Sequence, residues 1–282
     1  MGFSTRLHRA WERSNSLVCV GLDPDPRRFP SPLGTSVDDI ETFCRTIVDA
    51  TADSVCAFKP QIAYFAAHSA ERALERVCDH VRHDHPDVVL ILDAKRGDIG
   101  DTAEMYAREA FERYGADAIT VNPFLGTDSL EPFFARRDRG VIVLCRTSNP
   151  GSHELQNARV MRAGTDGDTA AKTEPLYEQI ARRAVSDWSL RTDVGLVVGA
   201  TQPAELKRVR DIVGDLPLLV PGVGAQGGDP ATVVAHGATA AGRGLIVNSS
   251  RAILYASGND DYAAAARRAT LELRDALNAA RT

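Results

Sequence analysis

The chain has 282 residues, of which 44% are hydrophobic, so it is long enough to bury a sizeable core. Its formal net charge of −5 gives no overall attraction to nucleic acid or to an anionic membrane surface, and we expect neither as a partner. The five cysteines are scattered without a CxxC pair, and no secretion signal or membrane-length apolar run is present, so a cytoplasmic protein with reduced thiols is expected.

Eight short, mostly apolar runs recur along the chain, each followed by a segment of helical periodicity. Continuous apolar runs are typical of parallel strands that are covered on both faces. The predicted strands span 16–23, 54–60, 88–95, 117–123, 140–148, 193–201, 217–224 and 244–250. Eight strand–helix units predict an α/β protein with a (β/α)8 TIM barrel fold, formed by a single domain over residues 1–282. A doubly wound open sheet is the main alternative.

The segments between the strands contain two clear helix predictions and one irregular stretch. Apolar residues at three-and-four spacing predict a helix over 61–84. A second helix is predicted over 101–115, with Asp101 as its N-cap and Gly115 at its end. The stretch 149–172 is too long for a simple connection and predicts a loop of the kind that often forms a lid.

Polar residues follow most of the predicted strands. In a parallel barrel, functional groups lie at the carboxyl ends of the strands and in the loops after them. The residues at these positions are Asp23, Lys59, Asp93, Lys95, Asn122, Ser148 and Arg251. Any one of them could simply be a polar residue at the solvent-exposed end of a strand. Several charged residues at the same end of a barrel favour a functional site.

Asp93 and Lys95 are two positions apart on one predicted strand, so both side chains should project to the same side. A carboxylate beside an ammonium offsets the desolvation of both charges, and loss of one partner of a buried pair costs about 3–5 kcal/mol. From this segment alone, a structural salt bridge and a catalytic pair are both open.

A glycine pattern follows the seventh predicted strand. Gly222, Gly224 and Gly227 spell G-x-G-x-x-G, but the acidic residue that a dinucleotide site needs about 20 positions later is absent. We therefore expect no nicotinamide cofactor. Glycines still let backbone amides approach an anion, and the loops after strands seven and eight of such barrels often bind phosphate. Arg251, in the second of these loops, could donate to phosphate oxygens.

Several segments together resemble one known family. The segment "LDAKRGDIGDTA" resembles the D-x-K-x-x-D motif of the orotidine 5′-phosphate decarboxylases. The likeness extends to "VGLDPD", "FKPQIAYF", "TSNPG", "PGVGAQGGDP" and "NSSRAILYA", in the family's order from position 20 to 255. The length and the last segment resemble the larger bacterial and archaeal subgroup. The resemblance implies a TIM barrel that converts orotidine 5′-phosphate (OMP) to uridine 5′-phosphate (UMP), the last step of de novo UMP synthesis.

The resemblance also implies roles for individual residues. The charged catalytic array would be Lys59, Asp93, Lys95 and Asp98, and Asp98 with Thr102 would reach the partner subunit's site in a homodimer. Asp23 and Lys59 would hold the ribose hydroxyls, and Ser148 the amide edge of the pyrimidine. Gln226 and Arg251 would hold the phosphate beside the glycine loop that contains Gly224 and Gly227.

The chemistry of this reaction fits such an array. Loss of CO2 from C6 leaves a carbanion on a ring carbon without an adjacent electron sink, and the sequence has no motif for a cofactor or a metal that would supply one. A cation beside C6 stabilises the developing charge and can donate the proton that completes UMP. Lys95 is the residue predicted to do both.

Three other functions stay open at this stage. A Mg²⁺-dependent keto-sugar-phosphate decarboxylase or aldolase of the same barrel superfamily would carry a glutamate ligand where Lys59 stands. An aldolase that uses a lysine Schiff base would need a lysine in apolar surroundings, away from carboxylates. A phosphate-binding barrel without activity is the third possibility.

Overall fold

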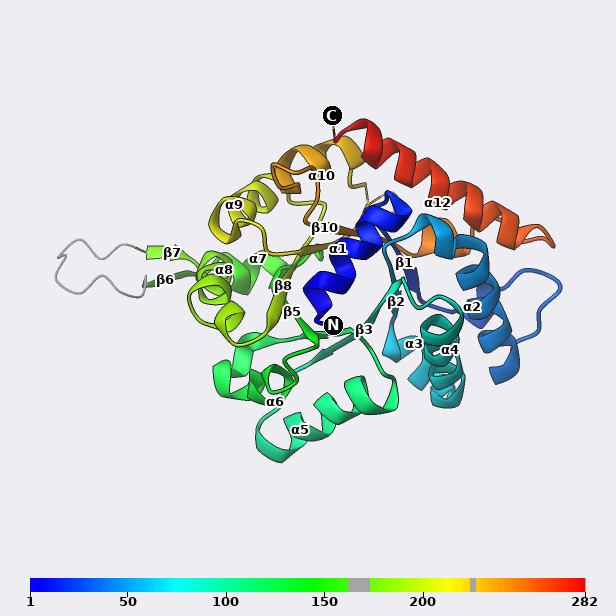
Figure 1. The fold of residues 1–282 in the computed structure, drawn as a ribbon, viewed down its shortest axis with the longest axis horizontal. Helices are drawn as coiled ribbons and strands as arrows, with labels where there is room; N and C mark the ends of the chain where they lie inside the picture. The colour runs from blue at the N-terminus through cyan, green and yellow to red at the C-terminus, as the bar shows by residue number, and fades with distance from the viewer. Residues whose placement is uncertain (162–172, 224–226, 282) are drawn as a thin grey trace.

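A computed structural model describes residues 1–161, 173–223 and 227–281. Among these residues, eight parallel strands close into a barrel in the order β1-β10-β9-β8-β5-β4-β3-β2 (Figure 1). They are β1 (Val18–Leu22), β2 (Ala57–Pro60), β3 (Val89–Arg96), β4 (Ala118–Val121), β5 (Gly140–Arg146), β8 (Asp193–Val198), β9 (Leu218–Pro221) and β10 (Leu245–Ser249). The closed barrel confirms the predicted (β/α)8 fold and excludes the open sheet.

The strands form where the sequence is continuously apolar because each is covered on both faces. Every residue of β1, β2, β4 and β10 is buried. All eight predicted strands are present, although most are shorter than expected because the predictions included flanking loop residues. Phe58, Ile91, Ile119 and Val247 belong to the buried core that the strands share with the surrounding helices.

Helices surround the barrel (Figure 1). The longer ones are α1 (Phe3–Ser14), α2 (Val37–Thr51), α4 (Glu71–Asp84), α5 (Gly100–Arg108), α8 (Leu176–Ser186), α9 (Pro203–Val213), α10 (Pro230–Gly237) and α12 (Tyr262–Ala279). Short helices are α3 (Ile62–Ala66), α6 (Glu131–Phe134), α7 (Ser152–Gln156) and α11 (Arg251–Leu254). In α2, Ser36 and Asp39 form a reciprocal capping box that fixes the start of the helix.

Helix α1 covers the amino-terminal end of the barrel, where it crosses the strands in Figure 1. Ser4 N donates a hydrogen bond to Asp193 Oδ2 at the start of β8, and Trp11 Nε1 donates one to the carbonyl of Leu245 at the start of β10. The donor–acceptor distance is 2.9 Å in both. Phe3 lies so close to Gly140, the first residue of β5, that an added Cβ there would be 2.5 Å from its ring. The carboxyl end of the barrel is therefore the end left for a site.

The predicted helix over 61–84 is wrong as a single element. The structure has α3 and α4 instead, separated by Ser69, whose φ of 52° is left-handed. Ser69 N donates to Ala66 O and Ala70 N donates to Phe65 O, which ends α3 in the manner of a helix C-cap. Three-and-four spacing persists across this break, so periodicity alone does not reveal it.

The predicted helix over 101–115 begins and ends differently. Helix α5 begins at Gly100 with Ile99 at the N-cap position, so the assignment of Asp101 as N-cap is wrong, and Asp101 lies in the first turn. A π-helical turn, η3 (Glu109–Arg113), continues α5. Gly115 follows with a φ of 58°, which confirms the predicted stop.

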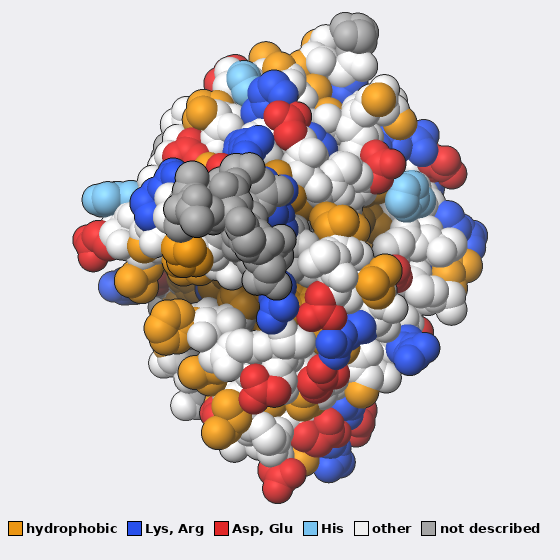
Figure 2. All heavy atoms as spheres, turned by 90° about the vertical axis from the view of Figure 1, so that its left-hand side faces the viewer, with side chains coloured by type: hydrophobic (Ala, Val, Ile, Leu, Met, Phe, Trp, Pro, Cys, Tyr) orange, Lys and Arg blue, Asp and Glu red, His pale blue; other side chains and the backbone are white. Residues whose placement is uncertain are grey.

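The stretch 149–172 is more structured than the predicted loop. It contains α7 and the strand β6 (Arg159–Met161), which pairs antiparallel with β7 (Thr173–Pro175). Residues 162–172 lie outside the described residues. Figure 2 shows the face that carries this hairpin, where acidic and basic side chains are interspersed and hydrophobic side chains gather beside the hairpin.

Candidate active site

Three charged side chains meet at the carboxyl ends of β2 and β3. Lys59 Nζ lies 2.6 Å from Asp93 Oδ2, and Lys95 Nζ lies 2.6 Å from Asp93 Oδ1, so each carboxylate oxygen holds one ammonium. The side chains of Lys59 and Asp93 are 5% and 9% exposed, whereas that of Lys95 is 45% exposed. We call these residues the Lys59–Asp93–Lys95 triad. The contact predicted between Asp93 and Lys95 is present, and the accessible ammonium is that of Lys95.

The backbone at Lys95 is not that of a regular strand. Lys95 has a φ of 48°, in the left-handed region, and the pairing of β3 with β4 shifts register between Leu92 and Arg96. The sequence predicted that the regular alternation of a strand brings the two side chains together. That prediction is wrong, because β3 is not regular at Lys95. A left-handed residue with a Cβ costs about 1–3 kcal/mol, and such conformations cluster at functional sites.

Thr120 of β4, which was not among the residues predicted from the sequence, holds this distorted segment. Its hydroxyl accepts hydrogen bonds from Ala94 N and Lys95 N, both at 3.0 Å, and donates to Asp93 Oδ1 at 2.9 Å. The signal in the sequence is a single polar residue within the otherwise apolar run "AITV". Thr120 fixes both the carboxylate and the backbone that carries the Lys95 ammonium.

Opposing effects set the charges of the buried pair. Burial raises the pKa of Asp93, but the positive charges of Lys59 and Lys95 outweigh it and hold that pKa well below its ordinary value. Burial lowers the pKa of Lys59, but the negative charges of Asp93 and Asp23 hold it above its ordinary value. Lys59 and Asp93 are therefore a charged pair at neutral pH.

Asp23 follows β1 next to this pair. Its Oδ1 atom is buried, and no hydrogen-bond partner for that atom lies among the described residues. Its backbone carbonyl accepts a hydrogen bond from the Tyr255 hydroxyl at 3.0 Å, which fixes the turn. Because a buried carboxylate oxygen without a partner is costly, this atom points to a ligand that donates a hydrogen bond.

Asp98 lies in the connection between β3 and α5, and Thr102 follows it near the start of α5. Asp98 Oδ1 accepts a hydrogen bond from Ile99 N at 2.9 Å, and among the described residues Asp98 forms no ion pair with Lys59 or Lys95. Thr102 is exposed in the first turn of α5. The structure of one chain thus brings three of the four predicted catalytic residues together and leaves Asp98 apart.

Ser148 lies two residues beyond β5, in close contact with the end of β8. A Cβ added to Gly199 would lie 2.8 Å from the Cα of Ser148, so only glycine fits there. Thr201 Oγ1 contacts the carbonyl of Ser148 at 3.4 Å. These contacts fix Ser148 at the carboxyl end of the barrel, the end that carries the triad.

Of the residues predicted to bind phosphate, the structure describes Gly227 and Arg251. Gly227 is exposed with a φ of 89°, and Gly222 has a φ of 97°, conformations that favour glycine. Arg251 is exposed at the start of α11 and forms no ion pair with another described residue. Gly224 and Gln226 lie outside the described residues.

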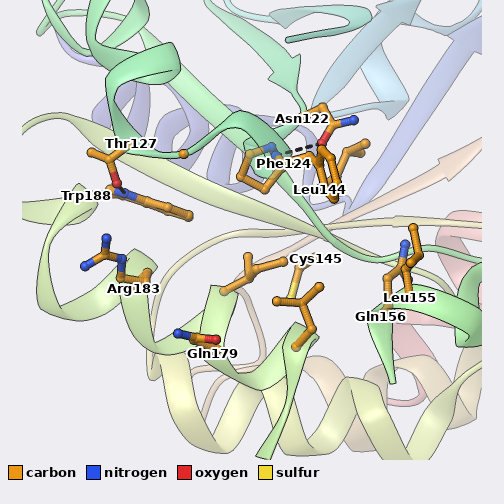
Figure 3. A pocket seen from close by; sticks show the side chains of 14 residues that line it. Asn122, Phe124, Thr127, Leu144, Cys145, Leu155, Gln156, Gln179, Arg183 and Trp188 are labelled. Carbon is orange, nitrogen blue, oxygen red and sulfur yellow. Dashed lines mark hydrogen bonds between the residues drawn. The ribbon is translucent and has the colours of Figure 1, made fainter. Parts of the chain in front are cut away.

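A cavity of about 620 Å³ lies beside the barrel mouth rather than at the triad (Figure 3). It is bounded by the loop after β4, the end of β5 and helices α7 and α8, and Trp188 donates to Thr127 Oγ1 at its edge. Most of its lining is apolar, and Arg183 is the charged residue in its wall. None of the triad residues lines it, so it is separate from the candidate active site.

Replacement of Thr120 by valine is expected to disturb the site without unfolding the barrel. The change removes the acceptor of two backbone amides and a donor to Asp93, so we expect turnover to fall by about 10–100-fold and the free energy of unfolding by about 1–3 kcal/mol. Thr120→Ser keeps the hydroxyl and is the control. Steady-state kinetics and urea denaturation measure both quantities, and equal turnover in the two variants would remove Thr120 from the site.

A closed barrel with a charged triad at the carboxyl end of its strands defines a (β/α)8-barrel enzyme. A model of the "Orotidine 5′-phosphate decarboxylase / HUMPS family" matches residues 16–269. A relative named orotidine 5′-phosphate decarboxylase, from Azoarcus sp. (strain BH72), is 59% identical over 281 residues, which is 100% of each chain. The solved structure of Leishmania donovani OMP decarboxylase has a TM-score of 0.83 at 38% identity, covering 100% of this chain and 99% of that chain. The chain therefore belongs to the orotidine 5′-phosphate decarboxylase / HUMPS family.

In the part of the chain that the structure describes, no helix combines the length and the apolar character needed to cross a membrane.

Proposed function

We propose that this protein decarboxylates OMP to UMP and CO2, the last step of de novo UMP synthesis. The observation that carries the proposal is the Lys59–Asp93–Lys95 triad, in a chain whose relatives are named for this reaction. A cytoplasmic location, expected from the sequence, is part of the same proposal. The five buried free cysteines support it, because reduced thiols suit a reducing compartment.

The triad supplies what the reaction needs. When the bond between C6 and the carboxylate breaks, its electron pair stays on C6 and CO2 leaves. The Lys95 ammonium beside C6 stabilises this charge and then donates a proton to C6, after which solvent restores its proton. Asp93 holds that ammonium, while buried Lys59 neutralises the second carboxylate oxygen of Asp93.

The remaining site residues would orient the nucleotide. Buried Asp23 Oδ1 would accept a hydrogen bond from a ribose hydroxyl, with Lys59 beside it. Ser148 would face the amide edge of the pyrimidine. Arg251 would hold the phosphate together with the glycine loop around Gly224, Gln226 and Gly227. Arg251 forms no ion pair with another described residue, which supports this role. A guanidinium that is not already paired can donate two charge-assisted hydrogen bonds to a phosphate.

The replacement Arg251→Ala is expected to weaken binding of UMP by about 10–100-fold, because it removes a charge-assisted contact of about 1.5–3 kcal/mol. Binding of uridine, which lacks the phosphate, should be unchanged. Titration calorimetry with both ligands measures the difference. An equal loss for uridine and UMP would show that Arg251 acts through the structure of the site rather than on the phosphate.

The active form is proposed to be a homodimer in which Asp98 and Thr102 complete the site of the partner. Large exposed apolar side chains next to these residues and in the turn after β4 support an interface with a second copy: Ile99 is 58% exposed, Met105 51% and Phe124 74%. Among the described residues, Asp98 forms no ion pair with Lys59 or Lys95 of its own chain, which is also in accord with a role in the partner's site.

Two inactive variants are expected to restore activity when combined. In a mixed dimer of Asp98→Ala and Lys95→Ala subunits, one site carries both changes and the other carries neither. Equal mixing with free subunit exchange should therefore recover about a quarter of the wild-type sites. Native mass spectrometry establishes that mixed dimers form. If mixed dimers form and remain inactive, Asp98 acts within its own subunit.

The test of the function is the loss of OMP absorbance and the formation of UMP by purified protein, with EDTA or with Mg²⁺. We expect equal turnover in both conditions. The Mg²⁺-dependent alternative places a carboxylate ligand at the end of β2, where Lys59 stands, buried and paired with Asp93. Activity that EDTA abolishes and Mg²⁺ restores would favour that alternative, and absence of UMP in both conditions would refute the proposal.

A further inference from the structure

A second cluster of chemically active side chains lies away from the triad, between helices α2 and α4. His80 belongs to α4, His85 follows its last residue, and Asp49 is in the last turn of α2. His80 Nε2 lies 2.6 Å from Asp49 Oδ1, and His85 Nε2 lies 2.8 Å from the same oxygen. The three ligand atoms are all within 4.8 Å of one another. Two imidazole nitrogens and one carboxylate oxygen thus converge on one point.

The surroundings hold His80 in place. Its side chain is 7% exposed, and its other nitrogen, Nδ1, lies 2.5 Å from Asp84 Oδ2, although without hydrogen-bond geometry. Both nitrogens of His80 therefore face carboxylate oxygens. Metal-binding histidines commonly have a carboxylate beside the ring nitrogen that does not bind the metal, and Asp84 has this position at His80.

The position of the cluster favours a cation. Helices α2 and α4 run side by side (Figure 1), and both end at the cluster, where their dipoles present partial negative charge. A cavity of about 290 Å³ next to His85 has room for water on the ion. Two arginines line this cavity, but Arg267 is paired with Asp53 at 2.7 Å and Arg13 donates to backbone carbonyls.

We propose that Asp49, His80 and His85 bind one divalent transition-metal ion of the Zn²⁺ type, with water completing its coordination. Two imidazoles select such ions over Mg²⁺ and Ca²⁺, which prefer oxygen ligands. The ligands of tetrahedral Zn²⁺, at about 2.0–2.1 Å from the ion, lie about 3.3 Å from one another. The Asp49 oxygen, now 2.6 and 2.8 Å from the two nitrogens, must therefore move away from them by about 0.5–0.7 Å. Asp49 can do so because its side chain is 55% exposed.

The ion would join α2 to α4 rather than take part in catalysis. Both helices end near the amino-terminal end of the barrel, because helices in such barrels run antiparallel to the strands, and features at that end serve stability. Binding of Zn²⁺ is therefore expected to raise the melting temperature and to leave turnover of substrate unchanged. The inference does not rest on the proposed function.

The test is titration of chelator-treated, reduced protein with Zn²⁺ in a calorimeter, and with Co²⁺ followed by its visible absorption. We expect one bound ion, a dissociation constant in the micromolar range or below, and a rise of several degrees in melting temperature. Asp49→Asn and His85→Ala should each weaken binding at least about tenfold. His83→Ala is the matched control: His83 is exposed on the same helix, and its ring contacts the carbonyl of Asp79.

Three results would overturn the proposal. These are the absence of binding, equal binding by Asp49→Asn and the wild-type protein, and an intense Co²⁺–thiolate band, which would assign the ion to cysteines. Circular dichroism of the variants shows that they are folded. His80 is left unchanged in these tests because its side chain is largely buried.

Discussion

The variant Lys95→Ala is expected to lower kcat/KM for OMP by at least about 10⁴-fold, because it removes both the cation beside C6 and the proton donor. The fold should be retained, since the Lys95 side chain is 45% exposed and contributes little to the core. Steady-state kinetics measure the rate, and circular dichroism with thermal melting measures the fold.

Lys207→Ala is the matched control for this variant. Lys207 is an exposed lysine on α9, paired with Asp211 at 2.8 Å, so its loss also removes one lysine–aspartate ion pair. Turnover of the control should equal that of the wild-type protein. Comparable turnover by Lys95→Ala and Lys207→Ala would exclude Lys95 from the mechanism.

The second large effect is expected for Asp93→Asn, which should lose both activity and stability. The amide cannot balance the buried Lys59 ammonium, and breaking a buried pair from one side costs about 3–5 kcal/mol. It also releases the Lys95 ammonium from its fixed position. Urea denaturation measures the free energy of unfolding, and OMP turnover measures the activity.

A double variant separates the two losses. Adding Lys59→Met to Asp93→Asn removes the unpaired buried charge, so the free energy of unfolding should recover while activity stays lost. Asp93→Asn with the stability of the wild-type protein would contradict the account of the pair. Recovery of activity in the double variant would contradict its catalytic role.

The barrel could be predicted from the sequence because its strands are buried on both faces and therefore read as continuous apolar runs. The helix break at Ser69 could not, because the apolar spacing of α3 and α4 continues across it. The position of the break depends on backbone hydrogen bonds around Ser69, and hydrophobic periodicity carries no information about them.

The triad was predictable in its members but not in its geometry. Asp93 and Lys95 are two positions apart in sequence, and Lys59 is the penultimate residue of the adjacent strand β2, so the order of the strands brings the three residues together. The left-handed backbone of Lys95 and its support by Thr120 arise from contacts between strands that no local pattern encodes. The cluster of His80 and His85 also depends on a distant residue, Asp49, which only the packing of α2 on α4 brings near.

The most direct test of the central claim is a crystal structure of the protein with bound UMP. We expect Lys95 Nζ within hydrogen-bonding reach of C6, about 3–3.5 Å, with Asp93 still between the two lysines and the phosphate at Arg251. A pyrimidine whose C6 faces away from Lys95, or a nucleotide bound away from the triad, would contradict the account.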